Sequence, residues 1–406
     1  MINLSLNKKV IIFGFIFTFF SSFGQSFFLG LFNTSIRNEL NITHGQFGSI
    51  YASATIISSL VLIWFGKKID EFKLINYSFV VIFLLFFSTF FFSLISNVYL
   101  LVIAIFLMRF SGQGLMSHTA TTAISRYFSK SRGKSLSAIW FGLSSAEFIL
   151  PILIVFLISL FSWRTVWQFI SLFTILTLPL VIFYTIREVT LSSRESNEPT
   201  SVEIFNVKQW KRVEVIKDFR FYIISLNMLA MPWIITGVFV YQSFISESKL
   251  WDIYTIPKSF MIYSLSSVLT LFFSGFLVDK FTSRRLIPII NIPLLIGLIL
   301  LYFFDSPLYA FLFFGLVGVS NGLANVLGSS TWAEIYGVRY IGSVKALTTA
   351  LMVFSTAFGT AFFGYLIDKS YTIETILITC VIYISVSLAI LLSIFSKIEP
   401  TLIKKA

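Results

Sequence analysis

The sequence predicts an all-α membrane protein whose chain crosses the bilayer twelve times. Of its 406 residues, 57% are hydrophobic and only 12% are charged, and the mean hydropathy is +0.90. This composition excludes a water-soluble globular domain. Twelve apolar runs are each long enough to cross a bilayer as a helix, and none shows the two-residue alternation of a membrane β-barrel.

The apolar runs form two groups of six, separated by one polar stretch. The first run follows two lysines, as in a signal peptide, but it lacks a small-residue cleavage site and is longer than such a segment. We therefore interpret it as the first spanning helix. In chain order the runs are residues 10–32, 47–65, 74–95, 98–123, 136–160 and 166–186, then 219–245, 259–278, 286–304, 308–331, 344–367 and 375–395.

The polar stretch between the sixth and seventh runs predicts a flexible linker. Residues 192–201 within it are polar apart from one proline, so they cannot bury an apolar core. The sequence thus predicts an N-terminal six-helix bundle over residues 1–186, a cytoplasmic linker over residues 187–218 and a C-terminal six-helix bundle over residues 219–406.

Two landmarks in the first half of the chain recur in the second half at one shared offset of 209 residues. Two separate landmarks with the same offset indicate an internal duplication. Because six helices separate the copies, both halves insert the same way up, which makes the repeat parallel. The paired positions are Gly66 with Gly275, Asp70 with Asp279, Tyr127 with Tyr336 and Gly133 with Gly342.

The positive charges predict how the chain is oriented. If the N-terminus is cytoplasmic, 24 of the 30 Lys and Arg residues lie on the cytoplasmic side, five lie opposite, and Arg109 lies within a span. Cytoplasmic loops are enriched in these residues, so we expect both termini to be cytoplasmic, in the inner (plasma) membrane. The net charge of +12 then follows from topology, and we expect no nucleic-acid partner.

One pair of opposite charges lies inside the predicted spans. Arg109 is the only charge in the fourth run and Glu147 the only charge in the fifth. Counted from the loop between these runs, their depths differ by only about 3 Å at 1.5 Å per residue, so we expect them to meet near the membrane centre. Such a pair either locks the two helices together, or Arg109 binds substrate while Glu147 is its resting partner and a candidate proton carrier.

Helix-breaking residues at matching places in the two repeats point to a binding site near the membrane centre. Gly24 in the first run and Pro232 in the seventh are 208 residues apart. Polar and aromatic residues near them, and two asparagines in the tenth run, are candidate substrate contacts; helix–helix hydrogen bonding is the alternative for the amides. These candidates are Gln25, Trp233, Asn227, Tyr241, Asn321 and Asn325.

Three stretches resemble signatures of the major facilitator superfamily of secondary transporters. Residues 66–73 and 275–285 resemble its signature loop, in which an aspartate follows a glycine by four residues and basic residues such as Arg284 and Arg285 come next. Residues 109–114 resemble its fourth-helix motif, Arg-x-x-Gly-x-Gly. The resemblance implies the fold of this family and transport by alternating access.

The same resemblance implies gating roles for the duplicated loops. Asp70 would meet the start of the eleventh helix near Gly342, and Asp279 would meet the start of the fifth helix near Gly133, where a carboxylate is favoured by the helix dipole. These contacts would close the cytoplasmic side. The residues implied in gating are Gly66, Asp70, Gly275, Asp279, Arg284, Arg285, Gly133 and Gly342.

A further similarity is to the organic-anion and monocarboxylate carriers within the family. It rests on residues 22–26, on Tyr241 with Gln242, and on residues 333–337. It implies a small organic anion, such as a monocarboxylate, as the substrate.

The sequence contains no signal for a cofactor or for enzymatic chemistry. It has one cysteine and two histidines, which cannot supply the usual protein metal centres. It also lacks a phosphate-binding loop ending in Lys-Ser or Lys-Thr and a metalloprotease motif. We therefore expect no cofactor, no metal and no enzyme.

The predicted function is secondary active transport of a small organic anion by alternating access, with proton coupling as an open option. Its partners would be the substrate, protons and the lipid bilayer, and we expect a monomer. Two alternatives stay open at this point. One is efflux of hydrophobic compounds by proton antiport, and the other is a transporter-like sensor that binds a ligand without net flux.

Overall fold

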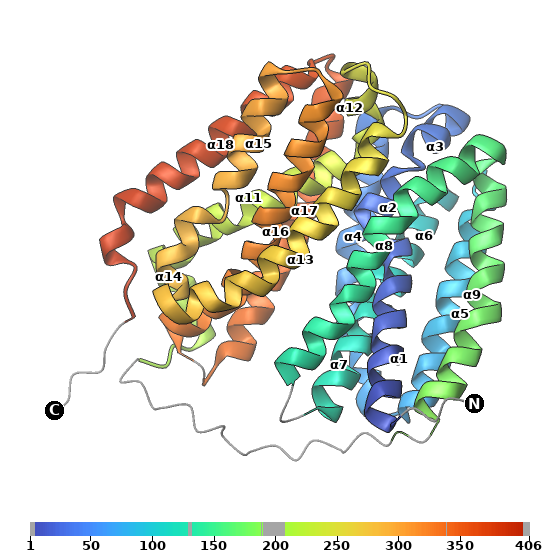
Figure 1. The fold of residues 1–406 in the computed structure, drawn as a ribbon, viewed down its shortest axis with the longest axis horizontal. Coiled ribbons are helices and arrows are strands. Elements are labelled where there is room, and N and C mark those ends of the chain that lie inside the picture. The colour runs from blue at the N-terminus through green and yellow to red at the C-terminus, as the bar shows by residue number, and fades with distance from the viewer. Residues whose placement is uncertain (1–4, 129–131, 188, 190–207, 338, 401–406) are drawn as a thin grey trace. The chain divides into compact units, whose positions relative to one another are not determined.

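The computed structural model describes residues 5–128, 132–187, 189, 208–337 and 339–400. Within these residues every regular element is a helix (Figure 1). Twelve helical segments are long and apolar enough to cross a membrane, which confirms the predicted class and number of spans. They are Leu6–Gly30, His44–Asp70, Leu74–Phe92, Val98–Tyr127, Lys134–Leu160, Trp163–Ile186, Phe219–Val240, Thr255–Val278, Ser283–Phe303, Pro307–Tyr336, Ile341–Asp368 and Ile373–Ser393.

Most spans are one long helix, whereas the first, second, fourth and ninth are built from two or three consecutive helices. The elements before the central polar stretch are α1 (Leu6–Ser21), η1 (Ser22–Gly24), α2 (Ser26–Gly30), α3 (Asn33–Leu40), α4 (His44–Lys67), η2 (Lys68–Asp70), α5 (Leu74–Phe92), α6 (Val98–Met108), η3 (Arg109–Met116), α7 (Ser117–Tyr127), α8 (Arg132–Leu160) and α9 (Trp163–Ile186). Those after it are α10 (Arg212–Lys217), α11 (Phe219–Val240), α12 (Gln242–Ser248), α13 (Thr255–Phe281), α14 (Ser283–Leu286), η4 (Ile287–Ile289), α15 (Ile292–Phe303), α16 (Pro307–Tyr336), α17 (Ile341–Asp368), α18 (Ile373–Ser393) and η5 (Phe395–Lys397).

Polar residues in the connections define where several helices begin. The Thr43 side chain accepts a hydrogen bond from the Gln46 backbone N–H, and the Gln46 side chain accepts one from the Thr43 N–H, which forms a capping box before α4. The side chains of Asn97 and Ser162 accept hydrogen bonds from backbone N–H groups at the starts of α6 and α9. Each cap satisfies a donor that the helix itself leaves unpaired, so these starts follow from local sequence.

The chain divides into two compact units. Unit 1 comprises Met1–Ser196, Phe239–Ser243 and Thr360–Asp368, and unit 2 comprises Asn197–Val238, Phe244–Gly359 and Lys369–Ala406.

In unit 1, α1 packs along α8, and α5 packs along α9 (Figure 1). Glycine allows the first of these contacts, because a Cβ atom at Gly142 of α8 would overlap the Phe15 carbonyl and the Thr18 hydroxyl of α1. Small residues of this kind let membrane helices approach closely.

In unit 2, α13 and α16 pack along each other, and α15 lies against both α16 and α18. Gly318 and Gly322 of α16 face backbone atoms of α13, including the carbonyl of Ser267. The Asn321 amide nitrogen donates to the Ser267 hydroxyl at 2.8 Å. This part of the tenth span is therefore a helix-packing surface.

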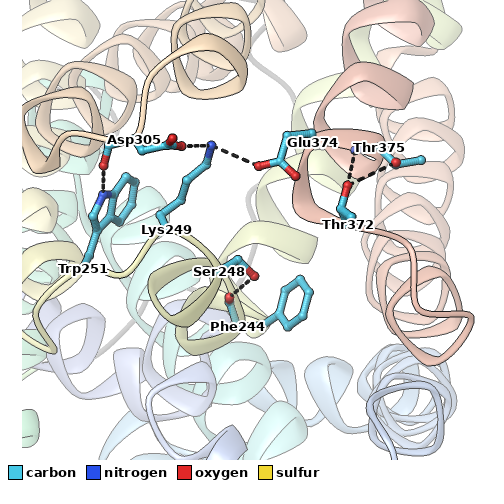
Figure 2. Close-up of polar contacts among 8 residues, drawn as sticks. All are labelled: Phe244, Ser248, Lys249, Trp251, Asp305, Thr372, Glu374 and Thr375. Atoms are coloured by element: carbon cyan, nitrogen blue, oxygen red, sulfur yellow. Dashed lines mark hydrogen bonds and ion pairs between the residues drawn. The ribbon is translucent and has the colours of Figure 1, made fainter.

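A buried lysine joins three connections of unit 2 (Figure 2). The Lys249 side chain, at the end of α12, is only 1% exposed, and its ammonium nitrogen lies 2.5 Å from Asp305 and 3.2 Å from Glu374. The Trp251 indole donates to the Asp305 carbonyl, and Thr372 caps the helix that carries Glu374. These contacts hold the ends of α12 and α15 against the start of α18.

The predicted linker over residues 187–218 falls mostly on residues 188 and 190–207, outside the described residues. Its last part is folded. The Trp210 backbone N–H donates to the Tyr336 carbonyl at 3.0 Å, and α10 follows at Arg212 with Val215 buried in the core of unit 2. Residues 208–217, the last part of the predicted linker, therefore pack against the end of α16.

Candidate functional site

The first span is broken where the sequence predicts. It stops after Gly24, Gln25 adopts an extended backbone with φ −81° and ψ 155°, and a helix resumes at Ser26. The matching break predicted at Pro232 is wrong, because α11 continues through Pro232. The interruption in this region falls instead at Tyr241, between α11 and α12. A single proline in a membrane helix can be accommodated without ending it.

The break lies against an unusual part of the fourth span. Residues Arg109–Met116 form a π-helix between α6 and α7. A Cβ atom at Gly24 would overlap backbone atoms of Met108 and Gln113, and one at Gly112 would lie 2.7 Å from the Gly24 nitrogen. The two backbones therefore touch, and only glycine fits at both crossing positions. π-Helical turns occur frequently at functional sites.

Arg109 opens the π-helix and is only 3% exposed. Its Nε donates to the Thr55 hydroxyl at 3.1 Å, and Nη1 donates to the Gly24 carbonyl at 3.0 Å and points at the Ser26 hydroxyl at 3.5 Å. The guanidinium carbon lies 5.2 Å from the ring centre of Tyr51. Arg109 thus binds the carbonyl that the helix break releases.

The predicted ion pair between Arg109 and Glu147 is wrong. Glu147, on α8, is also buried, with 8% exposure, but among the described residues its carboxyl group makes neither an ion pair nor a hydrogen bond. Arg109 points to η1, α2 and α4 instead. Counting residues predicts only depth along a helix, and depth does not determine which way a side chain faces around its helix.

The charge of Arg109 is therefore balanced by no carboxylate in the part of the chain that the structure describes. Its bonded partners are two hydroxyls, a carbonyl and an aromatic ring, and its Nη2 atom makes no hydrogen bond there. Burying a charge without an opposite partner is costly. Arg109 is therefore a buried charge whose partners among the described residues are all neutral.

Three residues around Arg109 were missed by the sequence analysis: Ser26, Tyr51 and Thr55. The Tyr51 hydroxyl donates to Ser26 at 3.0 Å, and all three side chains are at most 9% exposed. Tyr51 and Thr55 are four residues apart in an apolar span, so they share one helix face. That spacing of polar groups was a signal that could have identified them.

The candidates on α11 lie in different surroundings. Asn227 is fully buried, and neither polar atom of its side chain has a partner within the described ranges; its backbone carbonyl accepts from Asn291 at 2.6 Å. Trp233 packs edge-on against Tyr383 at 5.2 Å and Phe358 at 5.6 Å between ring centres. Asn227 thus keeps free hydrogen-bonding capacity, whereas Trp233 belongs to an aromatic cluster.

Tyr241 belongs to unit 1. Its hydroxyl lies 2.9 Å from the carbonyl oxygens of both His44 and Thr360, to which it can donate. In unit 2, Asn321 binds Ser267 as described above, and Asn325 is exposed.

The first gating loop makes contacts inside unit 1. The Asp70 carboxylate pairs with Arg126 of α7, a partner that the sequence analysis did not name. The Gly66 carbonyl lies 3.0 Å from the His118 ring nitrogen, and a Cβ atom at Gly66 would lie 3.1 Å from that atom. The end of α4 is thus held against α7.

The second gating loop is described in part. The side chain of Asp279 and the surroundings of Gly133 fall outside what the structure describes. Arg284 lies 3.3 Å from Glu334 and 3.4 Å from Glu399, and Arg285 is exposed. A Cβ atom at Gly275 or Gly342 would meet nothing within 4 Å. The gating roles of all these residues stay predictions.

These features define a multi-pass α-helical membrane protein with a broken first span and the buried Arg109 at the break. A family model described as Major Facilitator Superfamily matches residues 14–360 and 251–405. The chain therefore belongs to the major facilitator superfamily. Among the described residues, no group of three or more His, Cys, Asp or Glu side chains could hold a metal ion.

Solved structures with this fold include transporters. The chain is similar to a bacterial homolog of the human lysosomal transporter Spinster, with a TM-score of 0.74 and 14% identity over 98% of this chain and 99% of that one. It is also similar to the nucleoside transporter NupG, with a TM-score of 0.71 and 12% identity over 97% and 99% of the two chains. At these identities the likeness shows the fold alone. A comparison with curated proteins found no match.

Proposed function

We propose that this protein is a secondary active transporter that carries a small organic anion, such as a monocarboxylate, by alternating access. One observation carries the choice of an anion: Arg109 is buried at the break in the first span and is bonded there to neutral groups. A guanidinium group presents several donors in a fixed plane that suits a carboxylate. The substrate's negative charge would supply the missing partner.

Glu147 supports proton coupling in this proposal. It is a buried carboxyl group on α8 without an ion-pair partner among the described residues. Ionisable residues inside a membrane span commonly belong to proton or substrate pathways. We therefore propose that Glu147 carries the coupling proton, as a group separate from the anion site.

A ligand-stability screen on the purified protein tests the substrate class. A ligand that binds only the folded protein raises its melting temperature by mass action. We expect lactate, pyruvate or benzoate to raise it, and the matching neutral amides to leave it unchanged. Nucleosides belong in the screen because NupG is a nucleoside transporter, and a hydrophobic amine represents the efflux alternative. Stabilisation by either of these, with none by carboxylates, would overturn the anion proposal.

We also propose that both termini are cytoplasmic and that the protein lies in the inner (plasma) membrane. The support is the distribution of Lys and Arg, 24 of 30 on one side. Protease added to intact cells should therefore leave the stretch at residues 187–218 uncut, whereas permeabilised cells should show cleavage there. Cleavage of this stretch in intact cells would contradict the orientation.

A further inference from the structure

Two short segments from the second half of the sequence belong to unit 1. Phe239–Ser243 includes the end of α11 and the start of α12, and Thr360–Asp368 is the last part of α17. The helices α11 and α17 therefore contribute residues to both units. In the proposed orientation these segments lie at the outer ends of the seventh and eleventh spans.

The Asp368 carboxylate caps the start of the second span. Its Oδ2 atom accepts a hydrogen bond from the Thr43 hydroxyl at 2.6 Å and another from the Gly45 backbone N–H at 2.9 Å. The Gly45 N–H is among the first donors of α4, which have no partner within the helix. A negative charge is favoured at this position because the helix N-terminus is electropositive. The end of the eleventh span thus binds the start of the second through a charged contact.

Neutral hydrogen bonds surround this charged contact. They come from three side chains and end on backbone carbonyls that lie far away in the sequence. The Tyr241 hydroxyl contacts the carbonyls of His44 and Thr360 at 2.9 Å, the Gln242 amide donates to the Phe27 carbonyl at 2.9 Å, and the Asn33 amide donates to the Val240 carbonyl at 2.6 Å.

Asp368 is more exposed to solvent than the residues around it. Tyr241 is 1% exposed and Thr360 is 0% exposed, and a Cβ atom at Gly48 or Gly364 would overlap the Tyr241 hydroxyl. Asp368 itself is exposed and lines a pocket of about 500 Å³. Water can therefore replace the bonds of Asp368 first, whereas the neutral contacts are closed to solvent.

We propose that Asp368 is a gating residue, and that its bonds to Thr43 and Gly45 latch the outer ends of the seventh and eleventh spans into unit 1. The outer side can open only when Phe239–Ser243 and Thr360–Asp368 separate from the rest of unit 1. The charged contact of Asp368, at the exposed edge of this region, sets the frequency of that separation. This inference rests on the proposed alternating-access function. In this inference Asp368 acts by positioning the helix ends, and it does not contact the substrate.

Labelling of a buried cysteine tests the latch in the full chain. Cys380 is replaced by serine, and Thr360→Cys provides a nearly isosteric reporter at a fully buried position. A membrane-impermeant maleimide is then added to intact cells. We expect Asp368→Asn to raise the labelling rate about tenfold, which corresponds to about 1.4 kcal/mol. Asp368→Glu should restore slower labelling, because it keeps the negative charge.

The matched control is Asp252→Asn. Asp252 is also exposed, but it accepts the Tyr254 backbone N–H within its own turn, so its removal should leave labelling unchanged. Equal labelling rates in Asp368→Asn and Asp252→Asn would overturn the inference. If Thr360→Cys folds poorly, disulfide formation between Asn33→Cys and Val240→Cys replaces it; this cross-link should form more slowly with Asp368→Asn, and an unchanged rate would overturn the inference.

These readouts need no substrate, so they separate the latch from the transport proposal. Faster labelling in Asp368→Asn, together with no uptake of any anion by the unmodified protein, would support the latch and overturn only the anion proposal. Loss of anion uptake in Asp368→Asn with unchanged labelling would overturn the latch alone.

Discussion

Replacing Arg109 by glutamine is expected to abolish uptake of the organic anion, and adding Glu147→Gln is expected not to restore it. Glutamine removes the positive charge that we assign to substrate binding. Losing one partner of a buried, hydrogen-bonded charge pair weakens binding by about 2–5 kcal/mol, which is roughly 30-fold to several thousandfold. Because Arg109 and Glu147 do not contact each other in unit 1, removing the charge of Glu147 does not compensate for the loss of Arg109 at the binding site.

Measuring anion uptake into proteoliposomes, together with the melting temperature of each variant, tests this prediction. Arg109→Lys is the matched control, because it keeps the charge but cannot reach the Thr55 hydroxyl and the Gly24 carbonyl together as the guanidinium does. We expect it to bind the anion weakly. A double variant that is both stable and fully active would reinstate the Arg109–Glu147 ion pair as a structural contact, and the anion proposal would then fall.

The spans could be predicted from the sequence because the bilayer imposes one simple rule. Backbone groups inside it must be satisfied within the segment, so each apolar run of sufficient length becomes a helix. The helices begin at His44 and Trp163, three residues before the apolar runs at 47 and 166, because Thr43 and Ser162 each supply a side-chain acceptor that caps the start. Local chemistry decides these features, and no tertiary contact is needed to infer them.

The partner of Arg109 could not be predicted in the same way. Counting residues gives depth along a helix, whereas the direction of a side chain depends on helix rotation and on local winding. The π-helix at Arg109–Met116 changes that winding, and the pattern of apolar residues does not predict a π-helix. The guanidinium therefore meets the broken first span and α4, although connectivity favoured α8.

Asn227 and Tyr241, two of the candidate substrate contacts, do not lie on one helix. A regular helix through the seventh apolar run would place both on one face. The structure ends α11 at Val240 and starts α12 at Gln242, so the periodicity stops just before Tyr241. A pattern argument holds only while one helix continues.

Gly24→Ala is expected to destabilise the protein strongly and to reduce transport with it. The added Cβ would overlap the Met108 carbonyl and the Gln113 amide, which are backbone atoms that cannot rotate away. Overpacking of this kind costs about 1–3 kcal/mol, and it would also push the broken first span away from Arg109. The melting temperature of the purified protein should fall, and anion binding should weaken in the fraction that folds.

Gly328→Ala is the matched control, since a Cβ atom there meets nothing within 4 Å. It lies inside α16, where alanine is favoured over glycine by about 0.5–1 kcal/mol, so the melting temperature should stay level or rise. The two substitutions add the same methyl group, but only Gly24→Ala is expected to lower the melting temperature. If Gly24→Ala were as stable as Gly328→Ala, the first and fourth spans would not touch at Gly24, and Arg109 could not be held at the break as we describe.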